Sequence, residues 1–510
     1  MTIVFGTGPL SHQDLIEVAR NSAPIELDPV AVETVAKTRE AIEALANDPV
    51  PHYGISTGFG ALATKFIPEE MRTQLQRSLV RSHAAGSGPE IEREVIRGLM
   101  AQRLSTLMTA RTGVRPIVVE TYAAMLNAGI TPIVHEYGSL GCSGDLAPLS
   151  HCALALMGEG RVRDKSGEEM DTATAFKAAG IEPVELREKE GLALINGTDG
   201  MTAMLVLAIE DLRHLLRVAD IAVSLSVEGL LGNRSVFADD LQAMRPHPGQ
   251  RAAASNIRSL LEGSKLVDGA GIAEHARVQD AYSLRCSPQV NGAARDTVDH
   301  AERVASHELA SAIDNPVVTH DFRVESNGNF HGAPVAYVLD FLAIAIADVA
   351  SMSERRTDRF LDRARNYGLE PFLAHEAGVD SGLMIAQYTS AGIVSEMKRL
   401  AVPASVDSIP SSAMQEDHVS MGWAAGRKLR RSIDGFTRVL AIELLTAARA
   451  IAMRDGTPGE ATAKIAKLVN GATGGPGPDR FLTPDIDAVV ALVESGQVLH
   501  AAEEAIGNLE

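Results

Sequence analysis

The sequence predicts an all-α protein, a long antiparallel helical bundle with a smaller, loop-containing N-terminal region. Aromatic residues make up only 4% of the 510 residues, while Ala and Leu dominate, a composition that favours helices over strands. Beyond residue 200, apolar residues recur at helical spacing over segments longer than an average helix, and no strand alternation competes with them. Long helices that share one core pack naturally as an antiparallel bundle.

The expected long helices all lie in the C-terminal part of the chain, at residues 201–229, 294–313, 335–357, 381–400 and 421–454. Because 510 residues exceed the usual size of one compact domain, we expect the chain to divide into two regions. Residues 1–200 form an N-terminal region with the glycine-rich loops, and residues 201–510 form the long-helix bundle domain. The wide apolar helix faces also favour oligomerisation.

The N-terminal region is predicted to alternate helices with loops. Residues 12–47 have the spacing of two helices broken by prolines, and residues 71–83 have that of one amphipathic helix. Further helices are expected between residues 92 and 129. The charged, glycine-containing stretch 160–191 predicts a surface hairpin and a short helix.

Charge and cysteine content exclude several classes of protein. The net charge of −19, with no basic run, argues against a nucleic-acid partner, because no cluster of cations is present to neutralise phosphates. Three cysteines are too few for a disulfide framework and lack the spacing of metal ligands, so we expect no metal and a cytoplasmic protein. The first ten residues lack the basic and apolar segments of a signal peptide.

The longest apolar stretch, residues 334–352, raises the question of a membrane span. It contains Asp340 and Asp348, and carboxylates are costly inside a bilayer. We therefore expect a buried helix of the bundle and no membrane partner.

One glycine-rich stretch, residues 138–150, has two interpretations. Its glycines permit backbone conformations that are closed to residues with a Cβ. The simpler interpretation is a tight loop that enters a helix, with Ser143 or Asp145 as the N-cap of an apolar run. The second is that the loop reacts with itself, because strained loops are a recognised device at functional sites.

The self-reaction gives each residue of the triplet a purpose. If the amide nitrogen of Gly144 attacks the carbonyl carbon of Cys142, a five-membered ring closes. Loss of water from the ring and of the Ser143 hydroxyl then leaves an imidazolone with an exocyclic methylene. Gly144 offers an unhindered nitrogen, Asp145 can assist the proton transfers, and Cys142 contributes only its carbonyl, so its side chain is expected to be a spectator.

At these residues the sequence resembles the aromatic amino acid ammonia-lyase family, whose members build a methylidene-imidazolone (MIO) from Ala-Ser-Gly. Here Cys142 stands in place of Ala, a difference that should not stop cyclisation. Family motifs extend from about Tyr53 to Arg480 and are most similar to the histidine-specific branch. The resemblance implies an autocatalytically formed MIO cofactor and a homotetramer whose active sites combine residues from several subunits.

Two segments before the triplet carry further family motifs. Tyr53 opens a stretch with three glycines that lacks the Gly-Lys-Ser/Thr ending of a phosphate loop, so a surface loop is the simpler interpretation. By resemblance it is the family's lid loop, and Tyr53 is the catalytic tyrosine. His83 ends a helix, where histidines usually face the dipole or a carbonyl. In the family a Ser-His pair at this position is typical of the histidine branch.

Two segments after the triplet match the substrate-binding motifs of the family. Asn196 ends an apolar stretch in a predicted turn, and by resemblance its amide lies near the substrate's amino and carboxylate groups. On a helix, Tyr282 and Arg285 share one face, which could also be a plain exposed surface. The resemblance implies that Arg285 pairs with the substrate carboxylate, as its planar fork allows, while Tyr282 and Gln279 contact the amine and the MIO.

The last two motifs interrupt the predicted bundle. Phe330 follows a glycine turn, and by resemblance it lines the site near the MIO, while the role of the neighbouring His331 is open. The polar run 411–420 could be a capped, solvated helix start. In the family this run supplies a glutamate, here Glu416, and the branch often has Asn where this chain has Met414.

These residues together predict the reaction. An imidazole needs hydrogen-bond partners, because each unpaired buried polar group costs about 1–3 kcal/mol, and His83 and Glu416 suit that purpose. By resemblance we expect deamination of L-histidine to trans-urocanate and ammonia, with Tyr53 as base and Arg285 helping to lower its pKa. The alternatives are a phenylalanine or tyrosine ammonia-lyase, a 2,3-aminomutase of the family, and a non-catalytic helical assembly protein.

Overall fold

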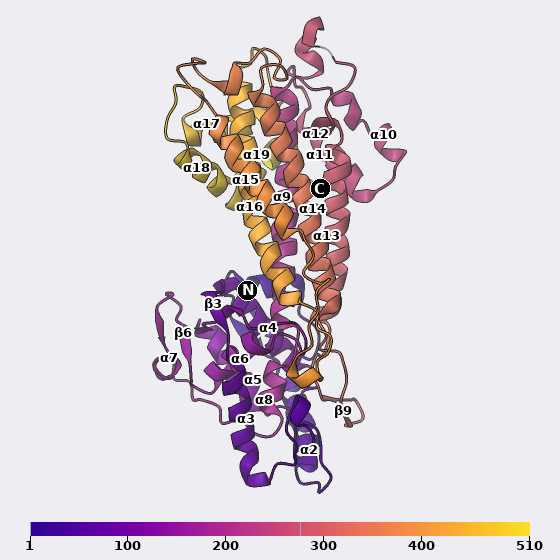
Figure 1. Ribbon diagram of the computed structural model, residues 1–510, viewed down its shortest axis with the longest axis vertical. Coiled ribbons are helices and arrows are strands. Elements are labelled where there is room, and N and C mark those ends of the chain that lie inside the picture. Colours follow the sequence, from indigo (N-terminus) through magenta and orange to yellow (C-terminus); the bar gives the residue numbers. More distant parts are fainter. Residues whose placement is uncertain (1, 276) are drawn as a thin grey trace. The chain divides into compact units, whose positions relative to one another are not determined.

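The computed structural model describes residues 2–275 and 277–510, and helices dominate it (Figure 1). The prediction of an all-α fold is confirmed, since the strands are short and few. The helices of the N-terminal 200 residues are α1 (His12–Ala19), α2 (Pro29–Ala46), α3 (Glu69–His83), α4 (Arg93–Met108), α5 (Pro116–Asn127), α6 (Leu146–Leu156), α7 (Thr172–Ala179) and α8 (Glu190–Ile195). The strands are β1 (Ile3–Phe5), β2 (Ile25–Leu27), β3 (Ser87–Glu90), β4 (Thr131–Pro132), β5 (His135–Tyr137), β6 (Arg161–Arg163), β7 (Glu169–Asp171), β8 (Val317–Val318) and β9 (Val324–Glu325).

The five long segments expected beyond residue 200 are all helical. They correspond to α9 (Asp199–Gly229), α13 (Ser287–Leu309), α14 (Ala333–Leu361), α15 (Met384–Leu400) and α16 (Gly422–Ala452). The remaining helices are α10 (Asp239–Ala243), α11 (Pro248–Leu260), α12 (Tyr282–Arg285), α17 (Glu460–Thr473), α18 (Thr483–Glu494) and α19 (Gln497–Ile506).

The chain divides into two compact units, and four of the five boundaries fall inside long helices. Unit 1 contains residues 1–207, 301–340 and 403–427, and unit 2 contains the rest. The first boundary lies close to the expected one at residue 200. The division nevertheless differs from the predicted split into 1–200 and 201–510, because two later segments return to unit 1 and bring Phe330 and Glu416 into it.

Local sequence signals explain the helix boundaries of unit 1. Ser11 caps α1 by accepting from the Asp14 amide, and the Asp14 carboxylate accepts from the Ser11 amide, which completes a capping box. Asp28 caps α2, with a proline in its first turn. The hairpin expected between residues 160 and 191 is present as β6 and β7, which pair antiparallel and are followed by α7.

A buried ion pair lies in the core of unit 2. The Glu443 carboxylate accepts from Arg356 Nη2 at 2.8 Å and from Ser226 Oγ at 2.6 Å, and both charged side chains are fully buried. A buried carboxylate is tolerated only when its partners replace the lost water. This network therefore holds α9, α14 and α16 together at one point.

Helix α14 is long and apolar enough to cross a membrane by length and composition alone, and 61% of its most apolar window is buried inside the protein. The carboxylate of Asp340 within it accepts the backbone amides of Ala404 at 3.1 Å and Ser405 at 2.8 Å. This burial is typical of a core helix and agrees with the expectation from the sequence.

Replacing Arg356 with Met should lower the free energy of unfolding by about 3–5 kcal/mol, because Glu443 would stay buried without its charge partner. Urea denaturation followed by circular dichroism measures the change. The matched control is Arg323→Met, because the ion pair of Arg323 with Asp321 is exposed and should contribute little. Equal shifts of the two midpoints would contradict the importance of the buried pair.

Candidate active site

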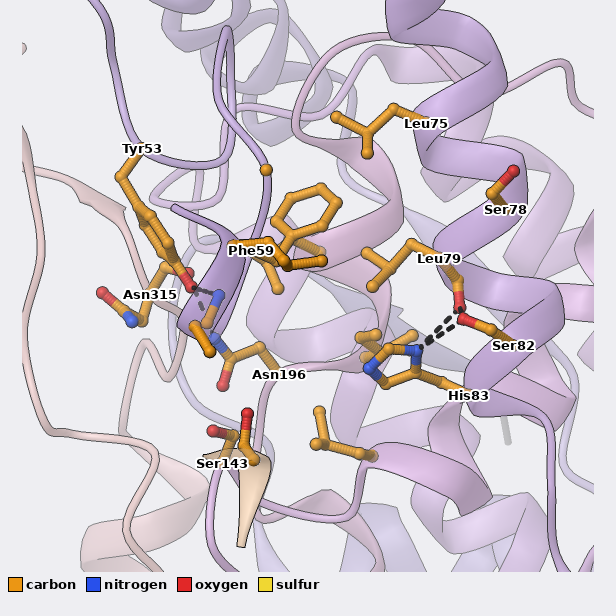
Figure 2. A pocket seen from close by; sticks show the side chains of 18 of the residues that line it. Tyr53, Phe59, Leu75, Ser78, Leu79, Ser82, His83, Ser143, Asn196 and Asn315 are labelled. Atoms are coloured by element: carbon orange, nitrogen blue, oxygen red, sulfur yellow. Dashed lines mark hydrogen bonds between the residues drawn. The ribbon is translucent and has the colours of Figure 1, made fainter. Parts of the chain in front are cut away.

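A cavity of about 590 Å³ in unit 1 brings together five of the residues predicted for the site (Figure 2). Tyr53, His83, Ser143, Asn196 and Glu416 all line it, although they come from five separate segments of the chain. The volume is in the range of small-molecule sites. The other lining residues are largely apolar: Gly58, Phe59, Gly60, Ala61, Leu62, Lys65, Ile67, Leu75, Ser78, Leu79, Ser82, Leu146, Leu192, Ile195, Asn315 and Ser412.

Other predicted residues do not line this cavity. Phe330 belongs to unit 1 and is half-buried outside the cavity lining. Gln279, Tyr282 and Arg285 belong to unit 2. Tyr282 and Arg285 do share the short helix α12, where the guanidinium carbon lies 4.7 Å from the centre of the exposed Tyr282 ring, as their predicted spacing required.

The loop that carries Ser143 is held by two glycines in close contact. Gly144 has φ of +78° and pairs with Gly197 in a parallel bridge. A Cβ on Gly144 would lie 2.0 Å from the carbonyl oxygen of Gly197, so no other residue fits. The amide of Asp145 donates to the same carbonyl at 2.7 Å. The loop is thus held against Gly197 at Gly144 and Asp145, and Ser143 faces the cavity.

Asp145 is fully buried directly after the triplet. Its carboxylate accepts from the amide of Met201 at 2.9 Å and from Ser139 Oγ at 2.9 Å. Burial raises the pKa of Asp145 to about 7, and the charge of Asp199 adds to this rise. The two hydrogen bonds lower the pKa but offset only part of the effect of burial. A carboxyl group with a pKa of about 7 can both take and give a proton at neutral pH.

The capping interpretation of this stretch is only half right. Asp145 occupies the N-cap position of α6, yet its side chain makes no capping hydrogen bond. Neither does Ser143, whose hydroxyl instead points to Oε1 of Glu416 at 3.4 Å. The Asp145 side chain bonds within the loop and to Met201, and the Ser143 side chain bonds to Glu416. Neither side chain accepts a hydrogen bond from the first amides of α6.

Cys142 was expected to be a spectator, and the structure gives its side chain a partner. Burial raises the pKa of the Cys142 thiol to about 12, and a hydrogen bond to Glu416 and the charge of that residue add to the effect. The thiol therefore stays protonated and contacts a residue of the site. Ser411 Oγ donates to the other oxygen of Glu416 at 3.2 Å, so the carboxylate is held from two directions.

The loop that carries Tyr53 folds back on itself over the cavity. The amides of Gly58 and Ile67 donate to the carbonyls of Lys65 and Ser56, both at 2.9 Å. The Gly60 amide donates to the Tyr53 hydroxyl at 3.3 Å. Burial raises the pKa of Tyr53, and the charges of Glu416 and Asp314 raise it further. Both charges named here are acidic, so they oppose the deprotonation that a base requires.

His83 presents one defined nitrogen to the cavity. Its Nδ1 lies 2.9 Å from the carbonyl oxygen of Leu79, in the last turn of α3. A carbonyl can only accept, so Nδ1 carries the hydrogen and the neutral ring keeps a lone pair on Nε2. Nε2 has no protein partner among the described residues, and Figure 2 shows the His83 ring reaching into the pocket that Ser143 and Asn196 also line.

Asn196 offers an unused acceptor on another wall. Its side-chain nitrogen donates to the carbonyl of Asn315 at 3.1 Å, while its Oδ1 is buried with no hydrogen-bond partner. Buried amide oxygens are normally satisfied, so an orphan that lines a cavity suits a ligand that donates hydrogen bonds. Asn315 itself lines the cavity, and its position in a conspicuous Asp-Asn-Pro motif was the available sequence signal.

The residues left open by the sequence lie outside the cavity lining. Met414 is exposed, in a turn with φ of +71°. His331 accepts from the amide of Ala333 at 3.4 Å, and its ring stacks on that of His418 with 5.5 Å between centres and 2° between planes.

Two buried ion pairs that the sequence did not reveal support the cavity floor. Arg103 pairs with Asp199 beneath the turn after Asn196, and Lys189 pairs with Asp314 next to Asn315. All four side chains are almost completely buried. Loss of one partner would leave the other charge buried and unpaired, which strongly destabilises a protein. Both pairs therefore hold in place the backbone that presents Asn196 and Asn315.

Known proteins share this sequence and fold. A family model described as aromatic amino acid lyase matches residues 10–471. A histidine ammonia-lyase from Streptomyces avermitilis is 61% identical over 100% of this chain and 99% of its own length. Two solved structures are each 36% identical: a tyrosine aminomutase from Streptomyces globisporus, with a TM-score of 0.94 and full coverage of both chains, and histidine ammonia-lyase from Trypanosoma cruzi, with a TM-score of 0.91 over 99% and 96%. This chain therefore belongs to the aromatic amino acid lyase family.

Proposed function

We propose that the chain is a histidine ammonia-lyase that converts L-histidine to trans-urocanate and ammonia without an oxidant. The observation that carries the proposal is the unpartnered Nε2 of His83 in the same cavity as Ser143 and Tyr53. An acceptor at this place suits the N–H of a substrate imidazole. The similarity to histidine ammonia-lyases at 61% identity over the whole chain supports the same substrate.

We infer that Cys142, Ser143 and Gly144 form the MIO of the family. The triplet fits this group, because Gly144 can carry no side chain beside Gly197 and the next residue, Asp145, is buried and able to exchange a proton. Once formed, the group supplies an electrophilic carbon that no amino-acid side chain offers. Glu416 lies against Cys142 and Ser143 and holds the triplet from the cavity side.

The remaining cavity residues bind the substrate and move its proton. Asn196 Oδ1 accepts from the substrate's ammonium group, which gives this buried oxygen its missing partner. Tyr53, as the phenolate, takes the β-proton and becomes the neutral phenol. Because burial and two carboxylates raise the pKa of Tyr53, a cation is needed beside it in the working enzyme, and Arg285 is the candidate.

Hydrogen bonding to the substrate ring also determines the choice between histidine and phenylalanine. His83 accepts from one imidazole nitrogen, and Glu416 accepts from the other when that nitrogen carries hydrogen. A phenyl ring in this place would leave His83 Nε2 without a donor, at a cost of about 1–3 kcal/mol, and would offer nothing to Glu416. These residues therefore favour histidine over phenylalanine, although the family includes enzymes for both kinds of substrate.

We further propose a homotetramer in which Gln279, Tyr282 and Arg285 complete the cavity of a neighbouring subunit. None of the three is among the residues that line the cavity, and Tyr282 is 69% exposed. Arg285 Nε is buried without a hydrogen-bond partner among the described residues. Exposed apolar side chains on α14 and α15, including Phe341, Ile385 and Tyr388, offer surface for assembly.

The direct test combines mass and turnover. The purified protein should weigh two waters less than its sequence and should produce urocanate absorbance from L-histidine. Ser143→Ala has no hydroxyl to lose, so it should show no such methylidene and should lose about 10³-fold or more in kcat. Phenylalanine and tyrosine serve as competing substrates. An uncyclised wild type that still makes urocanate would refute the cofactor, and activity on tyrosine or phenylalanine alone would refute the substrate.

His83→Leu should lower kcat/KM for L-histidine by about 10- to 100-fold, because the substrate's imidazole N–H would then lie buried without an acceptor. Steady-state kinetics measure the loss, and intact mass verifies that the triplet still cyclises. His500→Leu is the matched control, since His500 lies exposed on α19 of unit 2. An unchanged kcat/KM in His83→Leu would remove His83 from substrate recognition.

Shared active sites should show complementation between two inactive variants. Tyr53→Phe should lose about 10²–10⁴-fold in kcat as a missing base, and Arg285→Met should be similarly impaired. Co-expression of the two variants with different tags should restore roughly a quarter of the sites if the two residues come from different subunits. Doubly tagged oligomers without recovered activity would show that each site takes both residues from one chain.

A further inference from the structure

A hydrogen bond joins the chain that leaves His83 to the helix that leaves the MIO-forming loop. The backbone amide of Gly86, three residues after His83, donates to Nε2 of His151 at 3.1 Å. His151 lies on α6, which begins directly after Asp145. His151 therefore adds a hydrogen bond to the direct packing of α3 on α6, which carry the two cavity walls with His83 and Ser143. His151 itself is not among the residues that line the cavity.

The ring of His151 is held in the state that this bond requires. The amide of Gly86 donates, so Nε2 must carry a lone pair. Burial and the neighbouring His135 lower the pKa of His151 to about 4, and the ring stays neutral at working pH. His135 packs edge-on against it at 5.8 Å, and its Nδ1 donates to the carbonyl of Gly88 at 3.0 Å. Both rings thus hold the same short segment.

This segment is packed closely against α6 and the start of the MIO-forming loop. A Cβ on Gly86 would lie 3.0 Å from Nε2 of His151 and 3.3 Å from the carbonyl oxygen of Tyr137. A Cβ on Gly138, at the start of the MIO-forming loop, would lie 3.2 Å from the Cα of Gly86. Packing of this tightness transmits any displacement of His151 to the end of α3.

We propose that His151 is a positioning residue for substrate recognition, which fixes His83 Nε2 at its distance from Ser143 without touching the substrate. The inference rests on the proposed function, because it concerns the place of the imidazole acceptor. Loss of the His151 acceptor leaves the Gly86 amide unsatisfied, and the end of α3 relaxes to satisfy it. His83 then shifts, while the triplet, held by Gly197 and Asp145, stays in place.

The test compares a variant that keeps the acceptor with one that lacks it. His151→Gln places an amide oxygen near the position of Nε2, whereas His151→Leu has no acceptor. We expect His151→Leu to raise KM for L-histidine about tenfold, with kcat within about threefold of wild type and the two-water mass loss intact. His151→Gln should restore KM to within about threefold. His500→Leu is again the control.

A double-mutant cycle identifies the route of the effect. If His151 acts through His83, His151→Leu should change kcat/KM less than twofold when His83 is already Leu. Additive losses, or an unchanged KM in His151→Leu, would overturn the inference while leaving the proposed function in place. If His151→Leu does not fold, the same comparison is made between Gln and the shorter Asn, whose equal KM values would overturn it. A wild type that makes no urocanate would overturn the function and the inference together.

Discussion

The contact between Gly144 and Gly197 is the constraint on which the site depends. A Cβ on Gly144 would lie 2.0 Å from the carbonyl oxygen of Gly197, and one on Gly197 would lie 1.7 Å from a guanidinium nitrogen of Arg103. Two chain segments that are 53 residues apart therefore meet backbone to backbone. This contact fixes Ser143 at the cavity, buries Asp145, and places the turn after Asn196 directly beside the triplet.

The constraint costs stability, because it buries charge. Asp145 has a pKa of about 7 in the folded protein and an ordinary value of 3.8, so the folded state binds its proton more tightly. Its burial therefore costs progressively more stability as the pH rises from about 4 to about 7, and no more beyond that range. Arg103 pairs with Asp199 beneath the same turn, so this second buried carboxylate does not stand without a charge partner. The buried carboxyl of Asp145 nevertheless provides a group that can exchange a proton directly after the triplet.

The sequence predicted what local signals determine. Helical spacing gave all five long helices to within a few residues or one to two turns, and the motifs gave five of the cavity-lining residues. The division into units was less predictable, because the return of Phe330 and Glu416 to unit 1 depends on contacts between distant segments. The thiol of Cys142 against Glu416 and the burial of Asp145 also escaped prediction, because both depend on which side chains the fold brings face to face. His151 showed no sequence signal at all, since a histidine inside an apolar helix is usually a core residue.

The position proposed for imidazole recognition lies apart from the loop that carries the triplet. The triplet lies on one wall and is supported by Gly197 and Asp145. These supporting contacts do not involve the residues proposed to bind the substrate's ring. His83 lies at the end of α3 on another wall, where its Nδ1 is occupied by Leu79 and only Nε2 faces the cavity. A change of side chain at the end of α3 would alter recognition without disturbing cyclisation. In the proposed function the reaction and the choice of substrate are thus separable, provided that the spacing of the two walls, to which the His151–Gly86 hydrogen bond contributes, stays constant.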